Sequence, residues 1–371
     1  MEKKVCGQRL LALDVLRGIT IVGMILVNNP GSYTEVFAPL QHAAWNGLTP
    51  TDLVFPFFMF MMGISIYFSL RKFDFQFSFR VMGKILKRTV LLFLIGLGLN
   101  WLYTFSWDHL RILGILQRLA ICYGVGATIV LLLNHRYLPY FIMLLLVGYG
   151  GVLLTGSGFE YNEVNVLAKV DAFLLTPAHM YNDHGLDPEG VLSTCSAIAH
   201  VLLGFWVAWL VWGRSIVESQ ANRLYLQLIT LFLCGVILTF SGFLCSYGCP
   251  INKKVWSPTF VLTTCGLASS LLACLIWAID VKCYKRWTIF FKVFGVNPLF
   301  MYVFASVLAV LLGSLLLPVG DSCVSLHDYA FRLFQGFLND KTASLLYALV
   351  FVGLNWSVGY LLYRCRIIIK L

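Results

Sequence analysis

The chain has 371 residues, of which 59% are hydrophobic and only 12% are charged, and its formal net charge is +10. Soluble domains are usually about one quarter charged, so this composition excludes an ordinary soluble enzyme and indicates a polytopic membrane protein. A bilayer core about 30 Å thick needs about 20 apolar residues per helix, which leaves room for about ten spans and for no large soluble domain. We therefore expect residues 1–371 to form a single integral-membrane domain.

The apolar runs predict an all-α bundle of about ten transmembrane helices. The runs are too long and too evenly apolar for alternating barrel strands, and backbone groups that face lipid must be satisfied within a helix. Proline inside a run, as at Pro56, is tolerated because neighbouring helices can satisfy the freed carbonyl groups. The predicted spans are 10–29, 51–70, 84–102, 112–133, 137–154, 192–212, 224–245, 258–280, 294–317 and 344–363.

The distribution of lysine and arginine predicts the orientation. With a cytoplasmic N-terminus, most of the 27 basic residues fall in cytoplasmic segments, as the positive-inside rule requires. An even number of spans then places both termini in the cytoplasm and the loops 30–50, 155–191 and 318–343 on the outer face. Because the basic residues are spread over several segments, we expect membrane lipid and not nucleic acid as a partner.

Cysteine and metal-ligand patterns are weak. No CxxC or HExxH motif occurs, so we expect no metal site. Most of the 11 cysteines fall inside predicted spans, where they act as small apolar side chains. Cys245, Cys249 and Cys323 fall near the outer face and could form a disulfide bond.

Two further features bear on targeting. Asp14 and Arg17 interrupt the first apolar run and no small-residue cleavage site follows it, so we expect no removable signal peptide. The acceptor sequon for N-glycosylation occurs once, at Asn355, inside a predicted helix. This favours a bacterial inner membrane over a glycosylated lumenal setting.

The outer segments 155–191 and 318–343 are long, and the sequence predicts no regular secondary structure in them. Loops of this length are usually functional or disordered. The first is acidic and contains aromatic residues and His184. It would suit a cationic or sugar-like substrate, although a merely solvated loop has the same composition.

Several polar residues fall within the spans, where an ionisable group costs about 2.5–3.5 kcal/mol at mid-helix. Asp14 and Arg17 are three residues apart on one helical face and can pair. Arg118 has no acidic neighbour in the sequence and is a candidate anion contact. Asn297 and the proline after it would break the ninth span and expose backbone groups to a cavity.

The stretch 27–63 contains more groups able to carry a proton or hold a carbonyl than any other loop between apolar runs. Thr49 or Thr51 could cap the second helix, with Asp52 favoured by the helix dipole. The functional interpretation is that Asp52 orients His42 as a general base while Asn28 holds a carbonyl oxygen as it becomes negative. Neutral imidazole is suited to this role near neutral pH.

The runs LDVLRGITIVGMILVNNPG and HAAWNGLTPTDLVFPFFMFMMGISI resemble the heparan-α-glucosaminide N-acetyltransferase family and its bacterial membrane relatives. GILQRLAICY, LDPEGVLSTCSAIAHVLLG and FGVNPLFMY are similar to further blocks of that family. The resemblance therefore extends over most of the chain.

The resemblance implies transfer of an acetyl group from cytosolic acetyl-CoA to the amine of a glucosamine-type sugar on the outer, periplasmic face. It places the catalytic histidine at His42 and its partner asparagine at Asn28, with Asn29 as an alternative because the spacing departs from the family pattern. It also allows a homodimer. Donor contacts are expected from Arg118, Arg17 and Asn297, and acceptor contacts from Trp45, Asn46 and His184.

Two other functions are compatible with the sequence. One is an amino-sugar permease, and the other is an O-acetyltransferase that acts on an envelope polysaccharide. For an acetyltransferase, direct transfer and an acetylated His42 intermediate both remain open.

Overall fold

The computed structural model of the chain describes residues 11–369 except 182, 214–219 and 320–321. It divides into a terminal unit, Met1–Leu40 with Leu271–Lys370, and a central unit, Gln41–Ser270. Among the described residues, nine helices are long and apolar enough to cross a membrane, and a bent pair supplies a tenth. This confirms the predicted all-α polytopic bundle. Its orientation and its action as one functional domain stay predictions.

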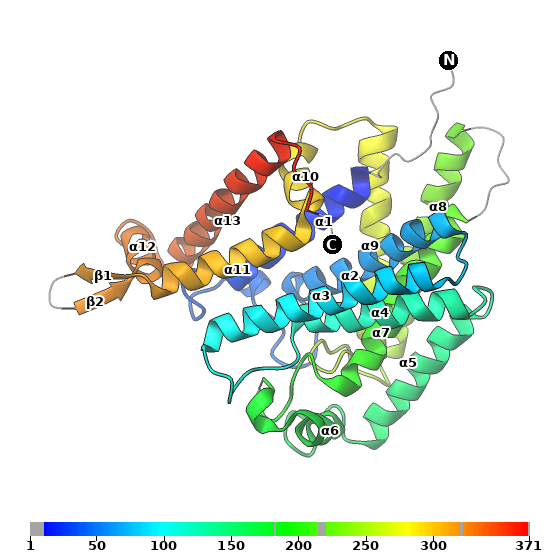
Figure 1. Ribbon diagram of the computed structural model, residues 1–371, viewed down its shortest axis with the longest axis horizontal. Coiled ribbons are helices and arrows are strands. Elements are labelled where there is room, and N and C mark those ends of the chain that lie inside the picture. Colours follow the sequence, from blue (N-terminus) through cyan, green and yellow to red (C-terminus); the bar gives the residue numbers. More distant parts are fainter. Residues whose placement is uncertain (1–10, 182, 214–219, 320–321, 370–371) are drawn as a thin grey trace. The chain divides into compact units, whose positions relative to one another are not determined.

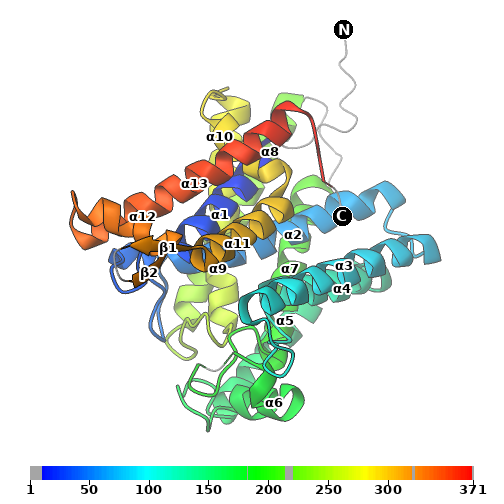
Figure 2. The ribbon, with the colours of Figure 1, turned by 60° about the vertical axis from the view of Figure 1, so that its left-hand side comes forward.

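The central unit contains most of the predicted spans, and its helices begin and end close to the predicted limits. Helix α3 starts after Ser78, whose hydroxyl accepts a hydrogen bond from the Val81 N–H. Helices α3 and α4 lie side by side (Figures 1 and 2). The elements are η2 (Pro50–Leu53), α2 (Val54–Leu70), η3 (Arg71–Phe73), α3 (Phe79–Thr104), α4 (Ile115–Leu132), α5 (Leu138–Thr155), α6 (Val166–Leu175), η4 (Pro177–His179), α7 (Val191–Trp212), α8 (Gln220–Cys245) and the larger part of α9 (Pro258–Ile276).

Helices α2 and α7 cross closely at two glycines. A Cβ atom on Gly63 would lie 2.1 Å from the carbonyl oxygen of Val201, and one on Gly204 would lie 2.3 Å from that of Phe60. In a bilayer, helices associate through packing because lipid is as apolar as their side chains, and small residues let two backbones approach. The crossing fixes α2, which follows directly after η2 and the predicted site.

The terminal unit contains the first and last spans and the bent pair. The pair bends by 86° between Val296 and Pro298, as the Asn-Pro sequence predicts. Figure 1 shows the hairpin and α12 beyond the end of α11. The elements are α1 (Leu11–Asn28), η1 (Ala38–Leu40), η5 (Trp277–Val281), α10 (Thr288–Val296), α11 (Pro298–Ser314), the antiparallel strands β1 (Leu316–Val319) and β2 (Ser322–Ser325), α12 (Leu326–Gln335) and α13 (Asp340–Arg364).

Helices α1 and α10 also cross at glycines. A Cβ atom on Gly18 would lie 1.8 Å from the carbonyl oxygen of Phe291, and one on Gly295 would lie 1.8 Å from that of Asp14. The same steric requirement therefore builds one helix pair in each unit. The bent pair begins from this crossing, because α10 is its first half.

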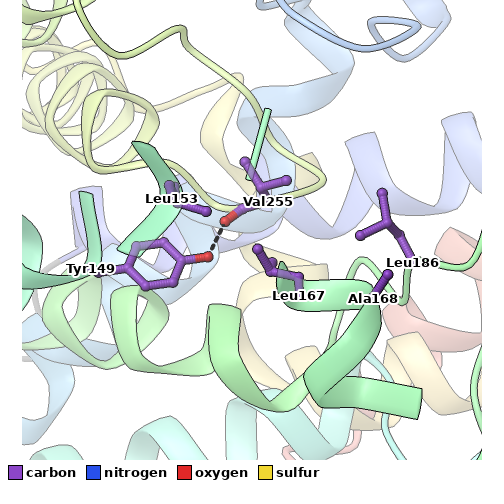
Figure 3. Close-up of a cluster of buried hydrophobic side chains, with 6 residues drawn as sticks. All are labelled: Tyr149, Leu153, Leu167, Ala168, Leu186 and Val255. Atoms are coloured by element: carbon purple, nitrogen blue, oxygen red, sulfur yellow. Dashed lines mark hydrogen bonds between the residues drawn. The ribbon is translucent and has the colours of Figure 1, made fainter. Parts of the chain in front are cut away.

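The expectation that the long outer segments lack regular structure is wrong. The segment 155–191 contains α6 and η4, and the segment 318–343 contains β2 and α12. Helix α6 is short but anchored: Leu167 and Ala168 pack in a buried cluster with Tyr149, Leu153, Leu186 and Val255. In this cluster the Tyr149 hydroxyl donates to the Val255 carbonyl at 2.5 Å (Figure 3). Helix α6 is capped by the Asn165 side chain, which accepts from the Leu167 N–H, and it buries Leu167, Ala168, Asp171 and Leu175 at helical spacing.

Other features agree with a membrane setting. Large apolar side chains remain exposed on α3, α5 and α8, for example Leu94, Val147 and Phe240, where lipid would cover them. The sequon residue Asn355 is buried within α13.

The ten described cysteines are free thiols, and they include Cys245, Cys249 and Cys323.

Asp171 fastens α6 to the start of α7. Its Oδ1 atom accepts a hydrogen bond of 2.8 Å from the Val191 N–H. The residue is fully buried, and its Oδ2 atom has no hydrogen-bond partner among the described residues. Burial raises the pKa of Asp171 from 3.8 to about 6, although the Val191 N–H and the Arg118 charge act in the opposite direction.

We expect Gly63→Val and Gly204→Val each to lower the melting temperature, because the added side chain must separate α2 from α7. The cost of such overpacking is about 1–3 kcal/mol. Thermal unfolding of the protein in detergent measures it. Gly148→Val in α5 is the control, because a Cβ atom there meets no atom within 4 Å. Equal losses in all three variants would contradict the crossing.

Asp171 should make stability depend on pH. Its folded pKa lies above its unfolded pKa, so its contribution is full below the unfolded value of 3.8 and is lost as pH rises through about 6. We expect the melting temperature of the wild type, relative to Asp171→Asn, to fall between pH 4 and pH 7. Asp108→Asn, at an exposed position, is the control. A constant difference across this range would show that Asp171 does not titrate there.

Candidate active site

The centre of the site is a histidine–carboxylate pair. His42 Nδ1 lies 2.7 Å from Asp52 Oδ1. The Asp52 side chain is 1% exposed, whereas that of His42 is 51% exposed. Because a carboxylate only accepts, this contact assigns a proton to Nδ1 and leaves Nε2 with a lone pair. No described residue is hydrogen bonded to Nε2, so this atom can accept a proton from outside.

Asp52 also organises the loop around the histidine. Its Oδ2 atom accepts hydrogen bonds from the Ala43 N–H at 3.1 Å, from the Thr49 N–H at 3.2 Å and from the Thr49 hydroxyl at 2.9 Å. Thr49 is the N-cap of η2 and Asp52 is its third residue, which is the capping-box arrangement. The capping role and the orienting role predicted for Asp52 therefore occur together, one on each carboxylate oxygen.

A lysine from a distant part of the chain completes the pair. Lys253 Nζ lies 3.3 Å from Asp52 Oδ1 and 3.0 Å from His42 Nδ1. With the Nδ1 proton directed at Asp52, the ammonium binds the carboxylate and lies against the ring without donating to it. Burial lowers the pKa of Lys253, and the negative charges of Asp52 and Glu189 oppose that shift.

The segment that carries Lys253 is held next to the His42 loop by backbone and amide hydrogen bonds. The Gly47 N–H donates to the Ile251 carbonyl at 2.8 Å, and the Asn252 amide donates to Asn46 Oδ1 at 3.1 Å. Gly47 has a φ of 126°, a conformation that is easy only for glycine. Asn46, predicted to contact the acceptor, thus joins two loops.

Trp45 and His184, also predicted to contact the acceptor, lie on either side of a tyrosine. The Trp45 and Tyr161 rings are stacked with centroids 4.5 Å apart, and the His184 ring is 4.2 Å from Tyr161. The Tyr161 hydroxyl donates to Asp183 at 2.5 Å, and Lys254 pairs with the same carboxylate at 2.6 Å. This aromatic stack, Trp45–Tyr161–His184, joins the His42 loop to the 155–191 segment.

Arg118 is completely buried in α4. Its Nη2 atom donates to the Gly190 carbonyl and to the Ser193 hydroxyl, and its guanidinium carbon lies 5.1 Å from the Trp256 ring centroid. Its Nε and Nη1 atoms have no hydrogen-bond partner in the described part of the chain. A buried cation with two unsatisfied donors is suited to an anion or a carbonyl group that enters the bundle.

The two candidate asparagines differ in their surroundings. Asn28 is the last residue of α1; its side chain is exposed, and its backbone carbonyl accepts from the Tyr33 hydroxyl. The Asn29 amide donates back to the Ile25 carbonyl at 2.8 Å, which partly occupies it. Asn28 belongs to the terminal unit and His42 to the central unit.

The other predicted donor contacts also belong to the terminal unit. Arg17 pairs with Asp14 at 3.2 Å, as their spacing predicts. The Asn297 side-chain amide makes two hydrogen bonds to the backbone near the C-terminus. It donates to the Ile367 carbonyl and accepts from the Ile369 N–H, each at 2.9 Å. Asn297 therefore holds backbone and does not present a free amide.

Within the central unit, the structure brings together His42, Asp52, Trp45, Asn46 and His184. Sequence reasoning missed Lys253, Tyr161, Asp183 and Lys254. Only the position of Lys253 and Lys254 in an outer loop between spans could have drawn attention to them. Among the described residues, no three His, Cys, Asp or Glu side chains form a group that could hold a metal ion.

The sequence is similar to known proteins over most of its length. Residues 9–178 match the family model described as heparan-alpha-glucosaminide N-acetyltransferase, catalytic. The Homo sapiens heparan-alpha-glucosaminide N-acetyltransferase is 31% identical over 355 residues, which cover 80% of this chain and 52% of that protein. The Mus musculus protein of the same name is 29% identical over 358 residues, which cover 80% of this chain and 53% of it. The chain thus spans about half the length of these relatives. Over this shared part, the chain is similar to the heparan-alpha-glucosaminide N-acetyltransferases.

Proposed function

We propose that this protein is a transmembrane acetyltransferase that moves an acetyl group from cytosolic acetyl-CoA to the amine of a glucosamine-type sugar on the outer face. The observation that carries the proposal is the His42–Asp52 pair, with one ring nitrogen oriented by a buried carboxylate and the other available. Similarity to the heparan-alpha-glucosaminide N-acetyltransferases supports the acetyl transfer and a glucosaminide acceptor. A bacterial inner membrane is the proposed location.

The proposed step is an aminolysis of a thioester. The neutral sugar amine attacks the acetyl carbonyl carbon, so that a C–N bond forms and the C–S bond to CoA breaks. His42 Nε2 takes the proton that the amine loses, and the same proton then neutralises the departing thiolate. Asp52 keeps the reactive nitrogen on the exposed side of the ring and stabilises the imidazolium that forms.

Lys253 shares the Asp52 carboxylate with His42 in this proposal. Its ammonium lies 3.3 Å from Asp52 Oδ1, the oxygen that contacts His42 Nδ1. It therefore offsets the negative charge of the buried carboxylate beside the ring.

The donor must reach the outer face from the cytoplasm. Arg118, buried and with two donors unsatisfied, is the proposed contact for polar groups of the pantetheine arm within the bundle. Asn28, with a free carboxamide at the end of α1, is proposed to donate to the thioester oxygen as it becomes negative. Arg17 lies on the same helix and is proposed to line the path.

We expect His42→Ala to reduce kcat by about 10²–10⁴-fold through loss of the base, and Asn28→Ala by about 10²–10³-fold through loss of oxyanion stabilisation. Purified protein with labelled acetyl-CoA and a panel of amino sugars measures both. Asn29→Ala is the matched control, because its amide is partly used by the helix. An acetyl group trapped on His42, together with ping-pong kinetics, would identify a covalent intermediate.

Undiminished transfer in His42→Ala, with acetyl-CoA binding retained, would remove His42 from its role. Transfer to sugar hydroxyls in place of amines would reassign the protein as an O-acetyltransferase. Sugar uptake into vesicles without acetyl-CoA, and no transfer, would identify a permease.

We expect Lys253→Met to lower kcat, because the ammonium that lies 3.3 Å from Asp52 Oδ1 is lost and that oxygen also orients His42. The transfer assay with labelled acetyl-CoA measures the change. Lys254→Met removes a charge from the adjacent position, which pairs with Asp183 and not with Asp52, and is the matched control. An unchanged kcat in Lys253→Met would contradict this role.

A further inference from the structure

The connection between α2 and α3 carries basic and aromatic side chains that the site described above does not use. Residues 71–90 contain six lysine or arginine residues and one acid, Asp74, and the connection between α4 and α5 adds Arg136. The Phe75 and His135 rings meet with centroids 4.7 Å apart, so the two connections lie side by side, on the right of Figure 1. This end of the central unit therefore has a large excess of positive charge.

Three of these cations share one face of α3. Arg80, Lys84 and Lys87 are separated by four and then three residues, and all three side chains are exposed. We call these three residues the basic face of α3. The Lys84 ammonium also lies 4.9 Å from the centroid of the Phe73 ring, which positions it without neutralising its charge. Among the described residues, no carboxylate forms an ion pair with the basic face.

Two neighbouring arginines are engaged by the protein itself. Arg71 donates to the Trp212 carbonyl at 3.2 Å. The guanidinium carbon of Arg88 lies 4.5 Å from the centroid of the Tyr123 ring of α4. The basic face differs from them because its charges point to the surroundings of the helix.

The length of α3 places the basic face beside the lipid headgroups. A helix of 26 residues is about 39 Å long, whereas the apolar core of a bilayer is about 30 Å thick. About 9 Å, or six residues, must therefore lie outside the core. Because the start of α3 is basic and its later turns are apolar, we assign this excess to the start of the helix.

The same side of α3 changes from basic to apolar along the helix. Val90 and Leu94 follow Lys87 by three and seven residues and are 45% and 55% exposed. Phe79 is 88% exposed at the first turn, and its ring meets that of Phe77 at 5.9 Å. Aromatic rings are favoured where the membrane meets water. A ligand with an anionic headgroup and acyl chains matches this order, whereas a water-soluble phosphate compound matches only its basic part.

We propose that the basic face of α3 binds the headgroup of an anionic phospholipid, with the phosphodiester against Lys84 and Lys87 and an acyl chain along Val90 and Leu94. Clustered basic residues next to a span attract anionic lipid through their summed charge, and lysine binds phosphate as a point charge. The bound lipid stabilises the start of α3 and, through it, the pair that α3 forms with α4.

The first test compares melting temperatures of the whole protein in phosphatidylcholine nanodiscs with and without phosphatidylglycerol. Phosphatidylglycerol should raise the melting temperature of the wild type. The triple variant Arg80→Gln, Lys84→Gln and Lys87→Gln should lose most of this rise and melt like the wild type in phosphatidylcholine alone, because its substitutions are exposed.

The matched control removes the same charge elsewhere. Lys282→Gln, Lys285→Gln and Arg286→Gln lie at exposed positions of the terminal unit and should keep the rise. An equal loss in both triple variants would show that net charge and not the basic face attracts the lipid, and an undiminished rise in the α3 variant would also overturn the proposal.

Native mass spectrometry provides a readout that does not depend on melting. The fraction of protein that retains phosphatidylglycerol should fall at least about 10-fold in the α3 variant and stay unchanged in the control. Glycerol 3-phosphate, added to protein in phosphatidylcholine, tests a soluble source of phosphate. If it stabilises the wild type as much as phosphatidylglycerol does, the ligand is not a lipid and the proposal fails. Acetyl transfer is not a readout, so the roles of His42 and Asn28 are tested separately.

Discussion

Close approach of helix backbones is the constraint on which both units depend. In lipid, apolar side chains gain little by leaving their surroundings, so helices must gain dispersion energy through contact at short range. Gly63 with Gly204 in the central unit, and Gly18 with Gly295 in the terminal unit, permit that contact. The first crossing fixes the helix that begins two residues after Asp52. The second fixes α10 up to the break at Asn297. Both helix crossings therefore depend on positions without a side chain.

Within the central unit, Asp52 combines a structural and a chemical role. A carboxylate that is 1% exposed needs several donors to remain charged, and it receives them from two backbone N–H groups, a hydroxyl, an imidazole and an ammonium. Oδ2 accepts hydrogen bonds from the loop, whereas Oδ1 contacts His42 and Lys253. The carboxylate at the end of the loop therefore also sets the tautomer of the imidazole ring. Removing Asp52 would therefore disturb folding and chemistry together.

The sequence predicted the features that depend on local pattern. The length of the apolar runs predicted the spans, and the Asn-Pro sequence predicted the break at residue 297. The pairing of His42 with Asp52 could be predicted because only ten residues separate them. It could not predict contacts between segments far apart in the chain. Lys253 is 211 residues from His42, and Tyr161 reaches Trp45 from another loop. Helix α6 was missed because its 10 residues are too few for a span, and its buried face packs against Tyr149 and Val255 from other parts of the chain.

The Trp45–Tyr161–His184 stack has a dynamic consequence. Together with the ion pair between Lys254 and Asp183, it fastens the His42 loop, the 155–191 segment and the segment preceding α9 to one another. Contacts of this kind make segments open as one cooperative unit and not as independent strips of chain. Amide protons of the three segments should therefore exchange with solvent at a shared rate. The loop that carries the imidazole would then open together with the other two segments of the central unit.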